Sequence, residues 1–217
     1  MKSYRTVEND SEFEIVINKS RFIGECHPVS SEEDAQKILD SVRKKYWDAK
    51  HHCYAFCIGE NRQTCRSSDD GEPSGTAGAP ILDSIVKRDL TNVICIVTRY
   101  FGGVLLGTGG LVRAYSQAAS NAIRKSNQIE MLPGSVLEME LSYQDWSRTQ
   151  SMLEEDGYSI MNIEYGASVK VSFLSLNEKT EEISEKIRNR TDGRVQTSLQ
   201  EERMIPAKIT GDTDDTE

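Results

Sequence analysis

The sequence predicts an α+β protein with two domains, and three observations lead to that class. A chain of 217 residues is long enough to bury two separate cores. Short apolar runs typical of strands alternate with segments whose apolar residues recur at helical spacing. The charge is uneven, because residues 1–125 carry a net charge of +1 and residues 126–217 carry −10. We therefore expect domains at 1–132 and 133–205, followed by an acidic, disordered tail at 206–217.

The first domain is expected to open with two strands and a helix. Residues 13–17 and 21–26 are apolar runs on either side of the polar turn 18–20. Ser31 is a good helix cap, and Asp34 three residues later makes a variant of the capping box. The apolar stripe of this helix comprises Ala35, Ile38, Leu39, Val42 and Tyr46.

The rest of the first domain alternates strands with helices. A run that is apolar on both alternating faces indicates a central strand, and a β-branched run indicates a buried one. In order, we expect a strand at 53–58, a polar turn at 59–68, a helix at 79–87, a strand at 92–98, a loop at 102–110 and a helix at 111–125.

The second domain is expected to begin after the turn signal Pro133-Gly134, where the charge also changes. Its elements are a strand at 136–142, a helix at 145–156, strands at 158–164 and 168–174, a helix at 178–190 and a strand at 195–203. This βαββαβ order is that of the ferredoxin-like split unit.

Cysteine usage and hydropathy indicate the compartment. Five cysteines with irregular spacing do not form the pattern of a disulfide scaffold. The first residues lack an apolar signal region, and no segment has the roughly 18 continuous apolar residues of a membrane span. We expect a cytoplasmic protein that does not contact membranes.

Two glycine-rich segments are the most informative feature of the chain. They contain more than half of its 15 glycines, between Gly71 and Gly110. Glycine is costly in regular structure, so such clustering indicates unusual backbone geometry or close approach to a partner. Charged and hydroxyl side chains among these glycines favour an exposed recognition surface over a linker.

The second glycine segment lies between a strand and a helix, which is a typical place for phosphate binding. However, Thr108 follows Gly107 where a P-loop needs Lys and then Ser or Thr. Val112 stands where a dinucleotide fingerprint needs its last glycine. We therefore expect no nucleotide cofactor, whereas a nucleic-acid phosphate or a protein carboxylate remains open as a ligand of Arg99, Arg113 and the loop amides.

Some side chains of the chain are of the types that bind metals or catalyse reactions. The carboxylates Asp69, Asp70 and Glu72 could bind a metal or serve in acid–base catalysis, although such residues also build ordinary turns. A hydrolase using this loop is one alternative function. The spacing Cys53-x-x-x-Cys57 is unlike a zinc knuckle, and in a strand both residues would simply face the core. We expect no metal and no catalytic residue.

Two aromatic residues adjoin the second glycine segment. Tyr100 and Phe101 could stack on bases or anchor a protein contact. They could equally close the core at the end of a strand.

A long composite motif resembles the signature of the IMPACT family. It comprises Asp69-Asp70-Gly71-Glu72-Pro73, Gly78-Ala79-Pro80, Arg99-Tyr100-Phe101-Gly102-Gly103-x-x-x-Gly107 and Gly109-Gly110-Leu111-Val112-Arg113-Ala114-Tyr115. The resemblance implies a first domain similar to the second domain of ribosomal protein S5. It also implies that the second domain is similar to the ferredoxin-like final domain of elongation factor G, as in the bacterial two-domain branch. Eukaryotic members restrain a kinase that phosphorylates a translation initiation factor, which implies regulation of translation.

These observations together predict a non-enzymatic regulator linked to translation. It should bind a ribosome-associated protein or the ribosome through its glycine-rich loops, and direct RNA binding is a second alternative. Asp69, Asp70 and Glu72 should order the first loop or contact basic groups of the partner. The expected binding residues are Asp69, Asp70, Glu72, Ser74, Thr76, Arg99, Tyr100, Phe101, Gly102, Gly103, Gly107, Gly109, Gly110 and Arg113.

Overall fold

The computed structural model describes residues 1–208, and their compact parts fall into two units. Tyr4–Glu130 form the larger unit and Met131–Ala207 the core of the smaller one. The boundary expected at 132 and 133 lies near this division but inside a strand. Of the acidic tail expected at 206–217, residues 209–217 lie outside the described residues, and residues 206–208 belong to a strand instead.

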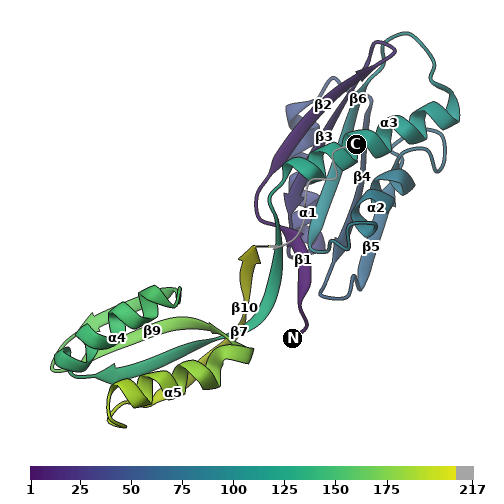
Figure 1. The fold of residues 1–217 in the computed structure, drawn as a ribbon. Helices are drawn as coiled ribbons and strands as arrows, with labels where there is room; N and C mark the ends of the chain where they lie inside the picture. Colours follow the sequence, from purple (N-terminus) through teal and green to yellow (C-terminus); the bar gives the residue numbers. More distant parts are fainter. Residues whose placement is uncertain (209–217) are drawn as a thin grey trace. The chain divides into compact units, whose positions relative to one another are not determined.

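The larger unit is built on an antiparallel sheet of order β2-β3-β6-β4-β5 (Figure 1). The strands are β2 (Ser11–Ile17), β3 (Ser20–Pro28), β4 (His51–Ile58), β5 (Thr64–Ser68) and β6 (Val93–Tyr100). Helices α2 (Gly78–Val86) and α3 (Gly107–Lys125) cover one face, and α1 (Glu32–Lys45) covers the other.

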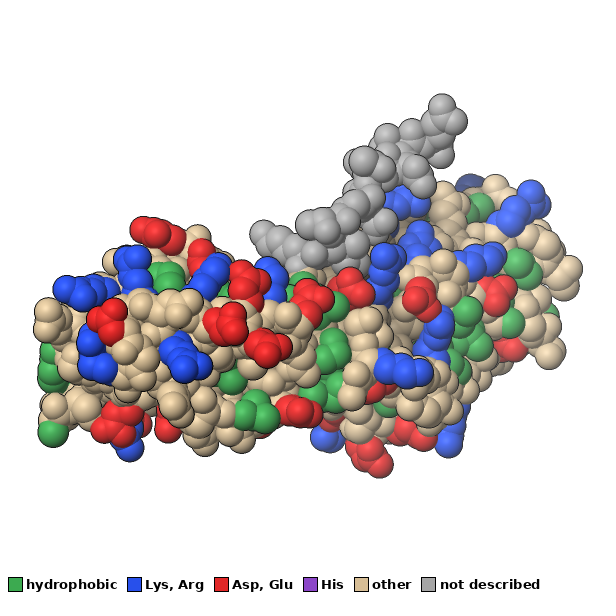
Figure 2. Space-filling model, turned by 60° about the horizontal axis from the view of Figure 1, so that its bottom comes forward, with side chains coloured by type: hydrophobic (Ala, Val, Ile, Leu, Met, Phe, Trp, Pro, Cys, Tyr) green, Lys and Arg blue, Asp and Glu red, His purple; other side chains and the backbone are tan. Residues whose placement is uncertain are grey.

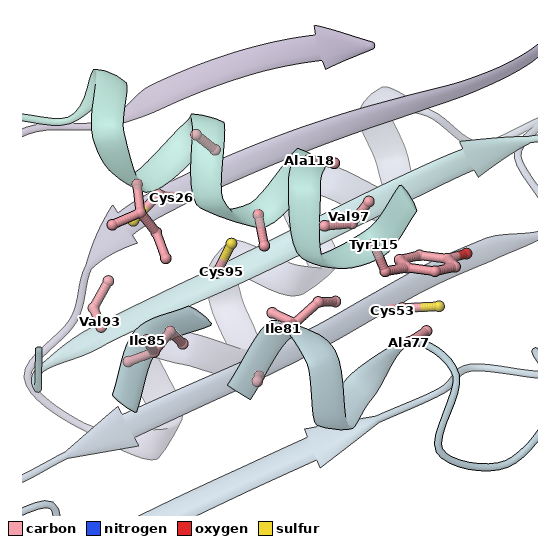
Figure 3. Close-up of a cluster of buried hydrophobic side chains, with 14 of the residues drawn as sticks. Cys26, Cys53, Ala77, Ile81, Ile85, Val93, Cys95, Val97, Tyr115 and Ala118 are labelled. Atoms are coloured by element: carbon pink, nitrogen blue, oxygen red, sulfur yellow. The ribbon is translucent and has the colours of Figure 1, made fainter. Parts of the chain in front are cut away.

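The alternation of side chains along β4 and β6 explains why both faces are covered. Cys53, Ala55 and Cys57 join the core beneath α2 and α3, whereas Phe56 faces α1 with Ile94 and Ile96 of β6. A strand that is apolar at every position is therefore buried on both faces. Figure 3 shows the first of these cores, with Ile81 and Ile85 of α2 and Ala118 of α3 above the sheet.

Several predicted elements are confirmed. The Ser31 side chain accepts a hydrogen bond from the Asp34 N–H at 3.1 Å, so it caps α1.

The turn expected at 59–68 is wrong in its second half, because Thr64–Ser68 form edge strand β5. This strand is short and polar, as edge strands often are, and therefore shows no apolar alternation. A further strand, β1 (Tyr4–Val7), was not predicted and pairs with β7.

The helix expected to begin at Leu111 begins at Gly107. Gly107, Gly109 and Gly110 thus form the first turn of α3 and are not part of a loop. A glycine in the interior of a helix destabilises it by about 1 kcal/mol relative to alanine, which is why the sequence pattern indicated a loop here. The first turn of a helix tolerates it better because its N–H groups lack intrahelical partners in any case.

The smaller unit has the βαββαβ order predicted from the sequence. Its elements are β7 (Gln128–Leu141), α4 (Tyr143–Glu155), β8 (Ile160–Tyr165), β9 (Val169–Leu176), the 3-10 turn η1 (Asn177–Lys179), α5 (Thr180–Arg190) and β10 (Thr197–Lys208). The strand order is β10-β7-β9-β8. One apolar cluster joins the sheet to both helices through residues that include Leu137, Phe173, Trp146 and Ile183.

The turn expected at Pro133-Gly134 is wrong, since both residues lie within β7. The paired register between β7 and β9 begins at Gly134, so Pro133 stands outside the ladder that its missing N–H would interrupt. No helix within residues 1–208 is long and apolar enough to cross a membrane.

Candidate functional site

Asp69 organises the first glycine segment, which connects β5 to α2. One carboxylate oxygen accepts hydrogen bonds from the N–H groups of Ala77 and Gly78 at 2.9 and 2.8 Å, and the other accepts from Gly75 at 2.8 Å. Burial raises the pKa of the Asp69 carboxyl, but the three hydrogen bonds outweigh it and leave that pKa lowered. Asp69 therefore closes the loop and supplies the cap that α2 lacks from its own N-cap residue, Ala77.

Asp70 ties the same segment to the neighbouring elements. Its carboxylate accepts hydrogen bonds from the backbone N–H of His52 at 2.6 Å and from the Arg43 guanidinium at 3.3 Å. Its carbonyl oxygen lies 2.8 Å from Nδ1 of His51. The Asp70 carboxylate is thus engaged by β4 and α1.

Glu72 connects the first glycine segment to the second. Its carboxylate is only 4% exposed and accepts hydrogen bonds from Arg99 Nη1 at 2.6 Å and from the Tyr115 hydroxyl at 2.8 Å. Arg99 is the penultimate residue of β6 and Tyr115 lies in α3, so the Glu72 carboxylate joins the first glycine segment to both. We call Glu72, Arg99 and Tyr115 the buried cluster.

Arg99 is enclosed on its other sides as well. Its side chain is 7% exposed, and the rings of Phe22 and Phe101 lie 5.4 and 5.5 Å from its guanidinium carbon. Nη2 donates to the Ser20 hydroxyl at 3.5 Å, and Nε is buried without a partner. The sequence expectation that Arg99 presents charge to a partner is therefore wrong, because Glu72 neutralises it inside the domain.

Burial controls the chemistry of Tyr115 and of the neighbouring Cys53. It raises the pKa of the Tyr115 hydroxyl, and it raises the pKa of the Cys53 thiol to about 12. Figure 3 shows the Tyr115 hydroxyl beside Cys53 and Ala77 at one end of the core. Both groups are neutral at physiological pH, and neither is an activated nucleophile.

The second glycine segment approaches the β2–β3 hairpin. The Gly102 N–H donates to the Ser20 hydroxyl at 3.1 Å. A Cβ at Gly102 would overlap the carbonyl group of Lys19, so only glycine fits. Gly103 has a φ of +83° and faces open space. The chain then turns outward, and Val104 and Leu105 are exposed, Leu105 to 85%.

The aromatic residues at the end of β6 do not close the core. Phe101 is 54% exposed and covers Arg99 with one face of its ring. Tyr100 is partly exposed and donates a hydrogen bond to Asp48 at 2.7 Å. That bond, together with burial, raises the pKa of Tyr100 to about 12.

The remaining predicted residues divide between the surface and the interior. Ser74 is exposed, whereas Thr76 is buried and donates to the Pro73 carbonyl at 2.7 Å. Arg113 is exposed and donates only to the Gly109 carbonyl, at 3.2 Å. Gly109 faces open space, and Gly110 lies against Leu106. The buried cluster therefore joins the first glycine segment to β6 and α3, the two elements that flank the second, and the charged residues serve mostly to hold this arrangement.

Sequence reasoning missed the exposed apolar residues nearby. Trp47 is 81% exposed and directly precedes Asp48, the partner of Tyr100. It follows the last residue of the apolar stripe on α1, so its position outside the stripe was a usable signal. Val104 and Leu105, two large apolar residues within a glycine segment, were another. We call Trp47, Phe101, Val104 and Leu105 the apolar rim.

Free cations accompany the apolar rim. Lys19, Lys50 and Arg113 are exposed, and none of them contacts a carboxylate of residues 1–208. Lys19 precedes Ser20, to which Gly102 is bonded, and Lys50 precedes β4, which pairs with the end of β6. The same region thus offers apolar side chains and unneutralised positive charge.

Two family models match the chain. Residues 18–123 match the Impact N-terminal domain, and residues 139–194 match a domain of unknown function (DUF1949). The first match contains both glycine segments and the whole buried cluster.

Individual relatives cover most of the chain. "IMPACT family member YvyE" of Bacillus subtilis is 37% identical over 194 residues, which are 89% of this chain and 89% of that protein. "IMPACT family member YigZ" of Escherichia coli is 34% identical, covering 86% and 92%. A solved structure titled "Crystal structure of an hypothetical protein" has 32% identity and a TM-score of 0.60, and covers 93% of this chain and 98% of that one.

Proposed function

The chain belongs to the IMPACT family, and from that premise we propose that it regulates translation by binding a partner protein at the ribosome. The binding surface would be the apolar rim and the open parts of the two glycine segments. In this proposal the protein acts in the cytoplasm, without a cofactor, and not as an enzyme.

The exposed apolar rim is the observation that supports binding most directly. Phe101, Val104 and Leu105 lie on one short segment, 101–105, which Gly102 fixes to the β2–β3 hairpin. Clustered exposed apolar side chains are typical of interaction sites, and loops held by a rigid scaffold often carry binding residues. The rigidity comes from the buried cluster, which holds the first glycine segment to β6 and α3, and from the Gly102–Ser20 hydrogen bond, which holds the second.

The composition of the surface favours a protein over RNA as the direct partner. Val104 and Leu105 cannot stack on bases, whereas they can enter an apolar groove of a protein. On the face shown in Figure 2, Lys and Arg side chains are intermingled with Asp and Glu. A nucleic-acid groove typically carries an extended positive field instead. Lys19, Lys50 and Arg113 would then meet acidic groups around the apolar contact.

The arrangement of the carboxylates argues against the hydrolase alternative. Asp69 accepts three backbone hydrogen bonds, Asp70 is engaged by His52 and Arg43, and Glu72 is neutralised by Arg99. A general base needs a lone pair directed at the substrate. All three carboxylates are directed at groups of the protein itself.

The link to translation comes from the proposed fold assignments. We assign the smaller unit to the ferredoxin-like class, supported by its βαββαβ order and its strand order β10-β7-β9-β8. We assign the larger unit to the fold of the second domain of ribosomal protein S5, which the family resemblance implies. Both folds occur in elongation factor G, and this argument is one of analogy.

Co-sedimentation with purified ribosomes tests the proposal. The double variant Phe101→Ala/Leu105→Asp should reduce ribosome binding about tenfold or more, since central apolar contacts are worth about 1–2 kcal/mol each. Val86→Ser is a matched control, because Val86 is an exposed apolar residue at the other end of α2. Binding that the double variant leaves unchanged would refute the apolar rim. Binding that nuclease abolishes, with a steep salt dependence, would favour RNA instead.

A further inference from the structure

Four of the five cysteines form two cross-strand pairs in the larger unit. Cys57 of β4 stands opposite Cys65 of β5, and Cys26 of β3 stands opposite Cys95 of β6. Directly opposed residues of antiparallel strands share one face, with Cα atoms about 4.5–5.5 Å apart. A disulfide needs a Cα separation of about 4.4–6.8 Å, so both pairs satisfy the backbone requirement. All five cysteines are free thiols in the structure.

The two pairs differ in their access to solvent. Cys26 and Cys95 are fully buried in the middle strands of the sheet, where α3 covers them (Figure 3). Cys57 is also buried, but Cys65 is exposed on edge strand β5. The Cys65 thiol makes a weak hydrogen bond to the Arg62 carbonyl at 3.8 Å. An oxidant can therefore reach the Cys57–Cys65 pair from the edge of the sheet, and cannot reach the central pair while the domain is folded.

The two thiols of the edge pair also interact with each other. Burial, followed by a hydrogen bond with the Cys65 thiol, raises the pKa of Cys57 to about 12. Cys57 is therefore a protonated, shielded thiol, and Cys65 is the one from which a reaction with an external reagent would start. This division resembles that of a sensor cysteine beside a resolving cysteine.

We propose that Cys57 and Cys65 form a site of reversible oxidation, at which a hydroperoxide converts the cross-strand thiol pair into a disulfide. This inference is independent of the proposed function. It rests on the register of β4 and β5 and on the exposure of one thiol of the pair.

The reaction takes place in two steps. The Cys65 thiolate attacks a peroxide oxygen, so that an S–O bond forms, the O–O bond breaks, and the leaving oxygen is protonated to water or an alcohol. The Cys57 sulfur then attacks the sulfenic sulfur of Cys65. An S–S bond forms, the S–O bond breaks, and the departing hydroxide takes the Cys57 proton as water. The thiol pair loses two electrons, which reduce the peroxide, and a dithiol reductant reverses the change.

The position of the disulfide gives the reaction a structural consequence. β5 is held by β4 on one side only, and it leads directly into the first glycine segment at Asp69. A Cβ at Gly78 would lie 2.8 Å from the backbone of Ser68, so the end of β5 is in close contact with the start of α2. Covalent attachment of β5 to β4 would therefore restrict the strand on which this segment is built.

Thiol counting on the full chain tests the proposal. After treatment with hydrogen peroxide, quenching and denaturation, the number of alkylated cysteines should fall from five to three. Peptide mapping should show one linkage, between Cys57 and Cys65, and dithiothreitol should restore all five thiols. The Cys26–Cys95 pair is an internal control, because it has the same cross-strand register but no solvent access.

Two variants complete the test. Cys65→Ser should retain all four of its thiols after the same treatment, and it changes an exposed residue. Cys57→Ala should leave Cys65 as a sulfenic acid that dimedone captures. The proposal is overturned if Cys65 is found only in its thiol form, only overoxidised or only linked to a second chain. It is also overturned if Cys26 and Cys95 become linked as readily as the edge pair.

Discussion

The buried cluster allows a sharp prediction, that Arg99→Met destabilises the larger unit far more than the loss of a surface ion pair. Methionine is similar in length to arginine and keeps an apolar stem between the rings of Phe22 and Phe101. It removes the guanidinium and leaves the Glu72 carboxylate with the Tyr115 hydroxyl as its one hydrogen-bond donor. Because the Glu72 side chain is 4% exposed, water cannot replace the lost partner.

The magnitude follows from this burial. Removing one partner of a buried ion pair costs about 3–5 kcal/mol, because the remaining charge is desolvated and unpaired. The double variant Glu72→Gln/Arg99→Met removes that charge while keeping an oxygen that can accept from Tyr115. We expect it to recover most of the loss and to lie about 1–2 kcal/mol below the unmodified protein, which is the net value of the lost hydrogen bonds.

Arg21→Met provides a matched control on the same sheet. Arg21 pairs with Glu14 at 2.9 Å and lies over the ring of Tyr100. However, the side chains of Arg21 and Glu14 are each more than 40% exposed. An exposed pair of this kind contributes about 0–1 kcal/mol. The control thus removes an arginine, an ion pair and a ring contact, and differs from Arg99→Met chiefly in burial.

Native-state hydrogen exchange, read by peptide, is the suitable assay, because the chain has two units that need not unfold together. Peptides from β4 and β6 should lose protection in Arg99→Met, and peptides from β9 should not change. A loss below about 1 kcal/mol, equal to that of Arg21→Met, would refute the reasoning, since the pair would then behave as a solvated one. A double variant no more stable than Arg99→Met would refute the role assigned to the Glu72 charge.

Two further predictions concern the glycine segments. Gly102→Ala should lower the free energy of unfolding by about 1–3 kcal/mol or more, because the new methyl group would overlap the Lys19 carbonyl. Gly109→Ala, which meets open space in the first turn of α3, should be neutral or stabilising, and thermal unfolding distinguishes the two variants. Asp69 has a lowered pKa in the folded state, so the unfolded state binds more protons, and the stability from its ionised form is lost as pH falls below about 4. Asp69→Asn should flatten this part of the stability–pH curve in denaturant titrations, and a curve that keeps its slope would contradict the assigned role.

The sequence was sufficient for elements whose signals are local. The all-apolar runs of β4 and β6 indicated strands buried on both faces, and Ser31 with Asp34 located the start of α1. Polar edge strand β5 was missed because its side chains are solvated on both faces and carry no alternation. Helix α3 was expected to start too late because glycine propensity outweighed the positional tolerance of a first turn.

The candidate site was only half predictable for a different physical reason. A loop arginine is usually exposed, so Arg99 was expected on the surface. Its actual partner, Glu72, lies 27 residues earlier in the chain, and their pairing depends on how the β5–α2 connection crosses the end of β6. No local pattern encodes such a contact. The convergence of the two glycine segments could be proposed from their composition, but the residue that joins them could not be identified.

The glycines themselves define how much of the motif is available to a partner. Gly78 and Gly102 face backbone of their own chain, and a side chain at either position would collide with it. Their absence of side chains is therefore required by internal packing and needs no ligand to explain it. Gly75, Gly103 and Gly109 meet nothing within 4 Å on the side where a Cβ would stand, so the internal structure does not account for them in the same way. Gly103 directly precedes Val104 and Leu105, which are exposed apolar residues like Phe101. In the proposed function, this turn therefore offers a partner both an open stretch of backbone and exposed apolar side chains.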